Sequence, residues 1–432
     1  MTTDRPVNPS PAPPTAGTIL AIPKSIWVLG LVSLCMDMSS ELIHSLLPVF
    51  LVTVLGASAV TVGVIEGIAE ATAAITKVFS GALSDHLGRR KLLTAVGYGL
   101  AALSKPLFPL AGSVTWVFVA RFADRIGKGI RGAPRDALIG DLAPEEVRGA
   151  SYGLRQTLDT VGAVAGPLLA IVLMVVFAGD MRAVFWVAVL PAMGAVALLI
   201  WGVQEPRRPT RSSDAPRQAW PFGRKELRSL GAPFWWLVAI GAVLTLARFS
   251  EAFLVLRAES GGLALALVPV VMVVMNVVYA LSAYPAGALS DRMDRRSILI
   301  IGTLLLLVAD VVLAAAPGSL TVLAGVALWG LHMGLSQGLL AAMVADRVNP
   351  ERRGTAFGLF NMVSGLTLLA ASVNAGWLWE IYGPPATFVA GAIFAGAAVV
   401  GLLIDKGRHA SQLAAGARSE GAATPSGRPG SR

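Results

Sequence analysis

Long apolar segments follow one another along most of the chain, and short polar stretches separate them. Most segments reach the roughly 20 residues with which an α-helix crosses about 30 Å of hydrocarbon. We therefore predict twelve membrane-spanning helices, six before and six after a polar segment in mid-chain. They cover residues 25–54, 59–84, 91–111, 115–139, 150–177 and 182–203, and then 233–257, 264–288, 297–316, 320–344, 355–380 and 384–404. The predicted fold class is an all-α integral membrane protein.

Three polar regions divide the predicted spans into domains. Residues 1–24, which are rich in Pro and Thr, and residues 405–432 are expected to be disordered cytosolic segments. Residues 204–232 combine many Arg residues with Pro and Ser, which predicts a basic cytosolic linker. The two six-helix bundles would then occupy residues 25–203 and 233–404.

The two halves share repeated sequence at nearly constant spacing. GALSDHLGRR begins at Gly81, and GALSDRMDRR begins at Gly287. DLAPEEVRGASYGL begins at Asp141, and DRVNPERRGTAFGL begins at Asp346. A repeat of this length indicates that the chain is a duplicated bundle.

The first repeat resembles the loop signature G-x-L-S-D-x-x-G-R-R of the major facilitator superfamily. The resemblance implies two six-helix bundles around a central cavity and a gating role for the signature. In the second copy Asp294 stands where the family usually has Gly, and Asp tolerates a left-handed turn better than most residues. The signature residues in this chain are Gly81, Asp85, Gly88, Arg89 and Arg90, and then Gly287, Asp291, Arg295 and Arg296.

We expect these loops to latch the cytosolic side of the molecule. Asp85 and Asp291 should each lie beside the positive N-terminal end of a helix of the opposite half. Arg89 and Arg295 should reach nearby carbonyls or acids. The alternative is that the loops only fix the orientation of the chain through their positive charge.

Composition and charge agree with a membrane protein. Hydrophobic residues make up 55% of the chain and charged residues 14%, which excludes a soluble fold. The net charge of +9 comes from loops on one side, whereas the opposite loops have only Arg182, so it reflects topology rather than nucleic-acid binding. Both termini are therefore predicted to be cytosolic, in a cytoplasmic (inner) membrane. Cys35 is the single cysteine, so no intramolecular disulfide can form.

Charged residues inside the predicted spans gather in the first half. They are costly in lipid, so they should face a cavity or pair with one another. Asp37, Glu41 and His44 lie on one face of the first span, and Glu66 and Glu70 lie one turn apart in the second. The fourth span supplies Arg121, Asp124, Arg125, Lys128, Arg131 and Arg135. From a rise of about 1.5 Å per residue, the expected partners are Arg121 and Arg125 with Glu66 and Glu41, and Lys128 with Asp37 and Glu70.

Either Asp37 or Glu41 is the expected proton-coupling carboxylate, for which proton and substrate would compete. The alternative is that both acids are permanently paired with the fourth span and only hold the bundle together. If the substrate is a metal cation, Asp37, Glu41 and His44 would be its ligands, since carboxylate and imidazole suit a divalent ion such as nickel. The second half has fewer charged groups, with Arg248, Glu251 and Asp310, and we expect His332 to join the cavity.

Two further motifs resemble those of the superfamily. Residues 125–133 resemble its helix-four motif R-x-x-Q-G-x-G-A-A, with Lys128 in the Gln position, and 124–136 resemble a bacterial branch that includes nickel-resistance exporters. Gly162, Gly166 and Pro167 match the G-x-x-x-G-P motif of its proton-coupled antiporters. The alternative for these glycines is close helix packing alone.

Asp159, with Arg155, is expected to close an inner gate with Arg131 or Arg135. Two motifs of soluble enzymes do not fit this context. GLSQG at 334–338 lies inside an apolar helix rather than at a nucleophile elbow. Gly129 follows Lys128 where a phosphate loop needs Ser or Thr. We expect neither catalysis nor a cofactor.

The sequence thus predicts a secondary transporter that exports a small solute, such as a drug, a metabolite or a metal cation, in exchange for protons. Alternating access would move two rocking halves around a midplane site. Uptake by proton symport and a non-transporting membrane sensor remain alternatives. Expected partners are the solute, protons and membrane lipid, with no nucleic acid, and the chain is expected to be monomeric.

Overall fold

The computed structural model describes residues 21–204, 230–290, 293–348 and 353–422, and helices form almost all of them. In the first half they are α2 (Lys24–His44), α3 (Leu47–Val49), η1 (Phe50–Val54), α4 (Ala59–Leu87), α5 (Arg90–Ser104), η2 (Lys105–Leu107), α6 (Val114–Leu142), η3 (Glu145–Val147), α7 (Arg148–Val176) and α8 (Met181–Gly202). In the second half they are α10 (Gly231–Ala247), α11 (Ala252–Ser260), η4 (Leu265–Leu267), α12 (Val270–Ser290), α13 (Arg295–Ala315), α14 (Ser319–Asp346), α15 (Arg353–Tyr382) and α16 (Pro384–Ala422). Each predicted span corresponds to one helix or to a group of consecutive short helices.

Among the described residues, 10 helical stretches are long and apolar enough to cross a membrane, by length and composition alone. The predicted spans 91–111 and 115–139 are not among them. α5 has only 15 residues before η2 continues it, and α6 has charged residues from Arg121 to Asp141. Both nevertheless pack inside the first bundle, α5 against α6 and α6 against α4. The chain has the arrangement of a multi-pass membrane protein.

The helices connect differently at the two ends of the molecule, which we name the linker side and the short-loop side. α2 begins, α8 ends and α10 begins at the linker side. Gly202 lies against Val28 at this end, and Arg347 donates a hydrogen bond of 2.7 Å to the carbonyl of Pro233. The opposite end, the short-loop side, carries tight connections such as the one at 55–58.

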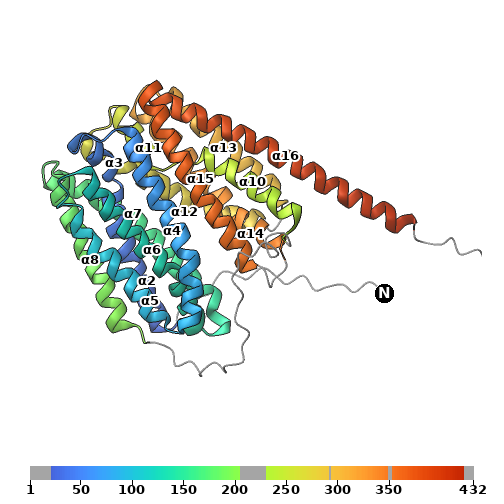
Figure 1. Cartoon of the computed structure of the whole chain (residues 1–432), viewed down its shortest axis with the longest axis horizontal. Helices are drawn as coiled ribbons and strands as arrows, with labels where there is room; N and C mark the ends of the chain where they lie inside the picture. The colour runs from blue at the N-terminus through green and yellow to red at the C-terminus, as the bar shows by residue number, and fades with distance from the viewer. Residues whose placement is uncertain (1–20, 205–229, 291–292, 349–352, 423–432) are drawn as a thin grey trace, which may run out of the picture.

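The two halves meet along α4 and α15, and also along α7 and α12. Figure 1 shows α4 and α15 side by side in the centre of the molecule. Glycines allow this close approach, because a Cβ atom at Gly67 would lie 2.8 Å from Cδ1 of Leu369, and one at Gly376 would lie 2.8 Å from Cα of Val60. These contacts lie toward the short-loop side, since Val60 is at the start of α4.

The first predicted span is broken near its middle. α2 ends at His44, and α3 and the π-helical η1 continue the span from Leu47. Pro48 follows the break, and since proline has no N–H group, the carbonyl of His44 loses its helical partner. The break exposes the end of α2 to the space between the halves.

The seventh predicted span is broken at the corresponding place, although no proline lies there. α10 ends at Ala247 and α11 begins at Ala252. A side chain of α15 supports the turn, because the N–H of Ser250 donates to the hydroxyl of Ser372 at 3.2 Å. Both breaks therefore lie in the interior of the molecule, one in each half.

α16 is longer than the sequence analysis predicts. The helix continues to Ala422, so it covers most of 405–432, where we expected disorder. Residues 405–422 contain five Ala residues and no proline, and this composition favours a helix. Figure 1 shows this part projecting beyond the bundles.

The two copies of the loop signature turn differently. Gly88 caps α4 in the left-handed conformation, with φ of 65°. Asp294 instead has φ of −59° and precedes α13, where its carboxylate accepts from the N–H of Arg296 at 3.4 Å. The expected left-handed turn at Asp294 is wrong, and the residue acts as an N-cap.

Candidate functional site

A cavity of about 710 Å³ lies between the two halves. The contact between α4 and α15 extends to Gly365, where a Cβ atom would lie 2.9 Å from Cβ of Ala74. Lys77 of α4 and Asn361 of α15 lie one turn further toward the linker side and line the cavity. The cavity therefore extends from this contact toward the linker side. Its titratable lining residues are Asp37, Glu41, His44, Glu66, Glu70, Lys77, Arg121, Arg125, Lys128, Arg131, Arg135, Asp159, Arg248 and Glu251.

Near the short-loop side, α4 and α6 are joined by ion pairs. Arg121 donates to Glu66 through two nitrogens, at 3.1 and 2.5 Å, and both side chains are buried. Arg125 lies 3.2 Å from Glu70. Glycines set the helix spacing, since a Cβ atom at Gly129 of α6 would lie 2.9 Å from the carbonyl of Ala73. Arg121 and Glu66 were predicted as partners, and this prediction is confirmed.

A second buried ion pair joins η2 to α6. Nζ of Lys105 lies 2.9 Å from Oδ1 of Asp124 and donates to the hydroxyl of Ser40 at 2.9 Å. The exposed fractions of Lys105 and Asp124 are 0% and 2%. Asp124 is therefore a partner for a hidden lysine rather than part of the cavity lining. The sequence analysis missed Lys105 because the residue stands at the start of η2, close to the predicted end of a span.

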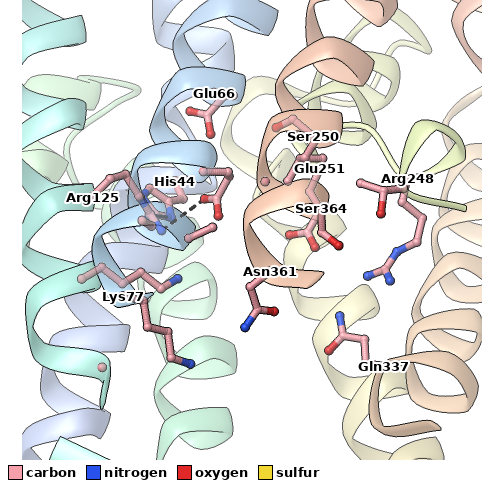
Figure 2. Close-up of a pocket in the computed structure, with 18 of the residues that line it drawn as sticks. His44, Glu66, Lys77, Arg125, Arg248, Ser250, Glu251, Gln337, Asn361 and Ser364 are labelled. Carbon is pink, nitrogen blue, oxygen red and sulfur yellow. Dashed lines mark hydrogen bonds and ion pairs between the residues drawn. The ribbon is translucent and has the colours of Figure 1, made fainter. Parts of the chain in front are cut away.

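His44 lies at the break of the first span and contacts groups from two helices. Its imidazole accepts from Nη2 of Arg125, with 2.6 Å between that nitrogen and Nε2. Nδ1 lies 3.4 Å from Oε1 of Glu41. Figure 2 shows His44 and Arg125 pointing toward one another from opposite ribbons. Among the described residues, the contact with His44 is the only hydrogen bond or ion pair of the Glu41 side chain, so Glu41 is loosely held.

Nearer the linker side, two carboxylates from α2 and α7 meet. Asp37 of α2 and Asp159 of α7 lie close to one another on the wall of the cavity. Arg131 lies 3.8 Å from Asp37, and Arg135 lies 3.8 Å from Asp159. Arg155 approaches Asp159 at 3.2 Å. The predicted approach of Asp159 to Arg135 is confirmed, but all these residues belong to the first half, so the pairs do not join the two halves.

Some charged lining residues have no hydrogen bond or ion pair from their side chains within the described part of the chain. They are Lys77, Lys128, Arg248 and Glu251. The predicted pairing of Lys128 with Asp37 and Glu70 is wrong, because Arg131 and Arg125 take those partners. Figure 2 shows Lys77 and Arg248 projecting into the cavity from opposite walls.

Comparison with known proteins identifies the family to which this architecture belongs. A family model described as the Major Facilitator Superfamily matches residues 29–274 and 252–427. The chain belongs to this superfamily. It is similar to an uncharacterised MFS-type transporter of Methanocaldococcus jannaschii, with 31% identity over 388 residues, which cover 88% of this chain and 94% of that protein.

More distant MFS proteins share the fold. The inner membrane transport protein YajR of Escherichia coli is 23% identical over 392 residues, which cover 86% of this chain and 81% of that protein. A crystal structure of a variant of the nucleoside transporter NupG matches with a TM-score of 0.73 at 13% identity, over 88% of this chain and 98% of that one. A D-xylose-proton symporter matches with a TM-score of 0.67 at 17% identity, over 87% and 96%. This chain is a membrane transporter with the MFS fold.

The G-x-x-x-G-P motif brings α7 against α2. A Cβ atom at Gly166 would lie 2.6 Å from the carbonyl of Met38 and 3.0 Å from Cβ of Glu41. Gly162 lies equally close to α2, beside Leu34, and Pro167 is buried next to the contact. Close packing thus accounts for the glycines. The packing also sets the position of α2, and therefore of its acids.

The signature arginines form ion pairs within their own half. Arg90 lies 3.0 Å from Asp141, and Arg295 lies 2.7 Å from Asp346. Asp141 and Asp346 are corresponding residues of the second repeat, so one signature arginine in each half meets its own half's copy. Arg89 is exposed. The side chains of Asp85 and Asp291, on which the predicted latch depends, lie outside the described residues.

A further cluster joins three elements of the second half on the linker side. Oδ2 of Asp405, on α16, lies 2.8 Å from Arg296 and 2.8 Å from Arg347. Arg296 follows the second signature, and Arg347 caps α14. The cluster therefore holds the linker-side ends of α13, α14 and α16 together.

Two further expectations are corrected by the geometry. His332 is fully buried between α13 and α14, where Nδ1 lies 2.7 Å from the carbonyl of Gly302, so it does not line the cavity. Asp37, Glu41 and His44 do not converge as metal ligands. Across the described residues, no group of three or more His, Cys, Asp or Glu side chains is placed to hold a metal ion.

Proposed function

We propose that this MFS transporter exports a small solute in exchange for protons, by alternating access of one cavity to the two sides of the membrane. The observation that carries the proposal is that Asp37 and Asp159 line the same cavity close to one another, with Arg131 and Arg135 each 3.8 Å from one of them. Two charged carboxylates so close together would repel one another, and a proton taken up by one of them would relieve that repulsion. Such a pair titrates as a unit rather than as two separate residues.

Arg131 and Arg135 would move in response to the protonation state of Asp37 and Asp159. Arg131 and Arg135 lie 3.8 Å from Asp37 and Asp159, which is longer than a hydrogen bond. When the proton leaves, both carboxylates become charged and attract the arginines. This would draw α6 toward α2 and α7, on the wall of the cavity. The proton would thereby change the shape of the half that carries it.

The orientation of the chain supports loading from the cytosol. Signature arginines and Arg347 lie on the linker side, and positively charged residues favour the cytosolic face of a membrane. Arg257 lies on the short-loop side, where the sequence analysis counted only Arg182. It is buried and donates to the carbonyls of Leu313 and Ala316 at 2.9 and 2.8 Å. We therefore place both termini in the cytosol, in the cytoplasmic (inner) membrane, with residues 25–203 and 233–404 as the two transport domains.

Flux in proteoliposomes with an imposed pH gradient tests this function. The liposomes would contain protein with its orientation determined by protease access, and labelled solutes would be scanned for uphill movement. Antiport predicts that solute moves against the direction of proton flow. Movement together with protons would instead show symport, and no gradient-driven movement of any solute would favour a non-transporting sensor.

The Asp37→Asn variant locates the coupling. It should insert and fold, keep exchange of solute down its gradient, and lose accumulation driven by the pH gradient. Glu41→Gln is the comparison, because the Glu41 side chain contacts His44 but no second carboxylate at hydrogen-bond distance. If Asp37→Asn accumulates solute with unchanged pH dependence, the pair does not couple transport to protons.

A further inference from the structure

We propose that the transported solute carries an anionic group, a carboxylate or a phosphate, and that Lys77 and Arg248 hold this group from opposite halves of the cavity. The proposal rests on the transport function above and names the substrate class of the same cavity. Asn361 and Gln337 complete the site with amide groups from α15 and α14.

Lys77 is a cation that α4 presents to the cavity without a protein partner. Its ammonium group has no hydrogen bond or ion pair within the described part of the chain, and the residue is exposed to the cavity. The aliphatic stem lies along α6, where Gly132 leaves room for it. A Cβ atom at Gly132 would lie 3.5 Å from Cε of Lys77. The stem is thus supported, and the charged end is free to bind.

Arg248 is the matching cation in the second half. It lies at the end of α10, where the helix break turns the chain into the cavity. Its guanidinium group likewise makes no hydrogen bond or ion pair with a described residue. Figure 2 shows the side chain pointing toward Gln337 and away from Glu251. A guanidinium group offers paired N–H donors that match carboxylate and phosphate oxygens.

Two amides lie between these cations. Figure 2 shows Asn361 and Gln337 on the second-half wall, at the level of Lys77 and the guanidinium of Arg248. Neither amide has a hydrogen bond to another described side chain. Amide N–H groups donate to anionic oxygens without adding charge. The site therefore has donors on several sides of one space, which suits an oxyanion.

Most carboxylates of the cavity already have basic partners, which argues against a cationic group at this level. Glu41, which contacts only His44 at 3.4 Å, lies further toward the short-loop side. Asp37 and Asp159 lie beside one another and within ion-pair distance of Arg131, Arg135 and Arg155. Glu66 and Glu70 pair with α6. Glu251 has no such partner, but it lies above the guanidinium of Arg248 in Figure 2, toward the short-loop side. The free charges nearest the linker side are positive.

Binding by both halves has a consequence for transport. Lys77 belongs to the first bundle and Arg248 to the second, so an anion between them would draw the halves together. An unpaired cation facing a second cation resists that approach. The loaded cavity can therefore close on the linker side more easily than the empty one, which is a requirement for coupled transport.

A charge-matched ligand series tests the proposal at equilibrium. Succinate, succinamide and 1,4-diaminobutane share a four-carbon backbone with negative, neutral and positive ends, and glycerol 3-phosphate with glycerol forms a second pair. Ligands that bind the folded state raise the midpoint of thermal unfolding. We expect the succinate or glycerol 3-phosphate arm to raise the midpoint of purified protein, and the neutral and cationic compounds to leave it unchanged.

Substitutions assign the effect to the site. Arg248→Gln and Lys77→Gln should each weaken anion binding by about tenfold or more, the value of one charge-assisted hydrogen bond. Lys24→Gln removes a positive charge from the same side of the molecule, outside the cavity, and should bind as the unchanged protein does. Stabilisation by the diamine, no stabilisation by either anion, or equal anion binding by Arg248→Gln and Lys77→Gln would each overturn the proposal.

These measurements need no pH gradient, so they separate the two proposals. Anion binding without gradient-driven flux would leave the substrate class intact and remove proton coupling. Gradient-driven flux of a cation, with no anion binding, would leave proton coupling intact and remove the anionic substrate class.

Discussion

The two halves of the molecule use the same helical plan around very different interiors. α6 and α14 begin at Val114 and Ser319, and their residues correspond in order. Where α6 has Arg121, Asp124 and Arg125, α14 has Val326, Trp329 and Gly330 at the corresponding places. One set is an ion-pair network, and the other is apolar packing.

The difference shows that the backbone arrangement does not depend on the charges. Trp329 is 1% exposed and packs against Phe249, with 5.5 Å between ring centroids. Asp124 is 2% exposed and packs against Lys105. A fully buried ion pair is rarely the most stable way to fill a helix contact, since its desolvation offsets the attraction. The charges in the first half are therefore better explained by function than by folding.

The largest expected loss of stability comes from breaking the buried ion pair of Lys105 and Asp124, and it tests the comparison of α6 with α14. Lys105→Met should lower the free energy of unfolding by about 3 kcal/mol, because it leaves the buried Asp124 carboxylate with only its longer contacts to Arg125 at 3.5 Å and Arg121 at 3.9 Å. The double variant Lys105→Met with Asp124→Leu should recover most of that loss and make α6 resemble α14. Thermal unfolding in detergent measures both. A double variant no more stable than Lys105→Met would show that the pair is structurally required.

A smaller effect is expected at the linker side of the second half. Asp405→Asn should cost about 1.5–3 kcal/mol, because the carboxylate accepts from both Arg296 and Arg347 and is largely buried. Asp346→Asn is the control, since its pair with Arg295 is exposed and worth no more than about 1 kcal/mol. Unfolding midpoints of the two variants give the comparison. Equal losses would contradict the view that burial sets the strength of these pairs.

The contact between α2 and α7 gives a third test. Gly166→Ala places a Cβ atom 2.6 Å from the carbonyl of Met38, so α7 must shift, at a cost of about 1–3 kcal/mol. Gly153→Ala, in the same helix, meets no atom within 4 Å and should stabilise by about 0.5–1 kcal/mol. Chemical unfolding of the two variants separates packing from helix propensity. A neutral Gly166→Ala would mean that the motif has no packing role.

The sequence predicted the fold well, because span length and the repeat are both direct consequences of the bilayer and of duplication. It also predicted the pair between Arg121 and Glu66. α4 and α6 both begin on the short-loop side, so counting residues from Ala59 and Val114 gives equal depths. The same count also puts Arg125 level with Glu70, but Glu70 was assigned to Lys128 and Arg125 to Glu66 or Glu41, so the observed pair of Arg125 with Glu70 was not predicted.

Other features could not be read from the pattern. The depth of Asp37 depends on α2, which begins on the opposite side, so Lys128 was assigned the partner that Arg131 has. The break before α11 has no proline to reveal it. Lys105 gave no signal as a buried partner, because a lysine near the predicted end of a span is ordinarily exposed. These are tertiary relations between helices rather than properties of one segment.

The central claim is that proton coupling belongs to the first half, although both halves line the substrate cavity. Asp37→Asn and Glu251→Gln each neutralise one carboxylate that lines the same cavity, one in each half. Uphill flux in proteoliposomes, measured against exchange without a gradient, is the most direct test. The account predicts that Asp37→Asn loses uphill flux and keeps exchange, whereas Glu251→Gln keeps the ratio of the two. Loss of pH-driven flux in Glu251→Gln, with normal coupling in Asp37→Asn, would contradict it.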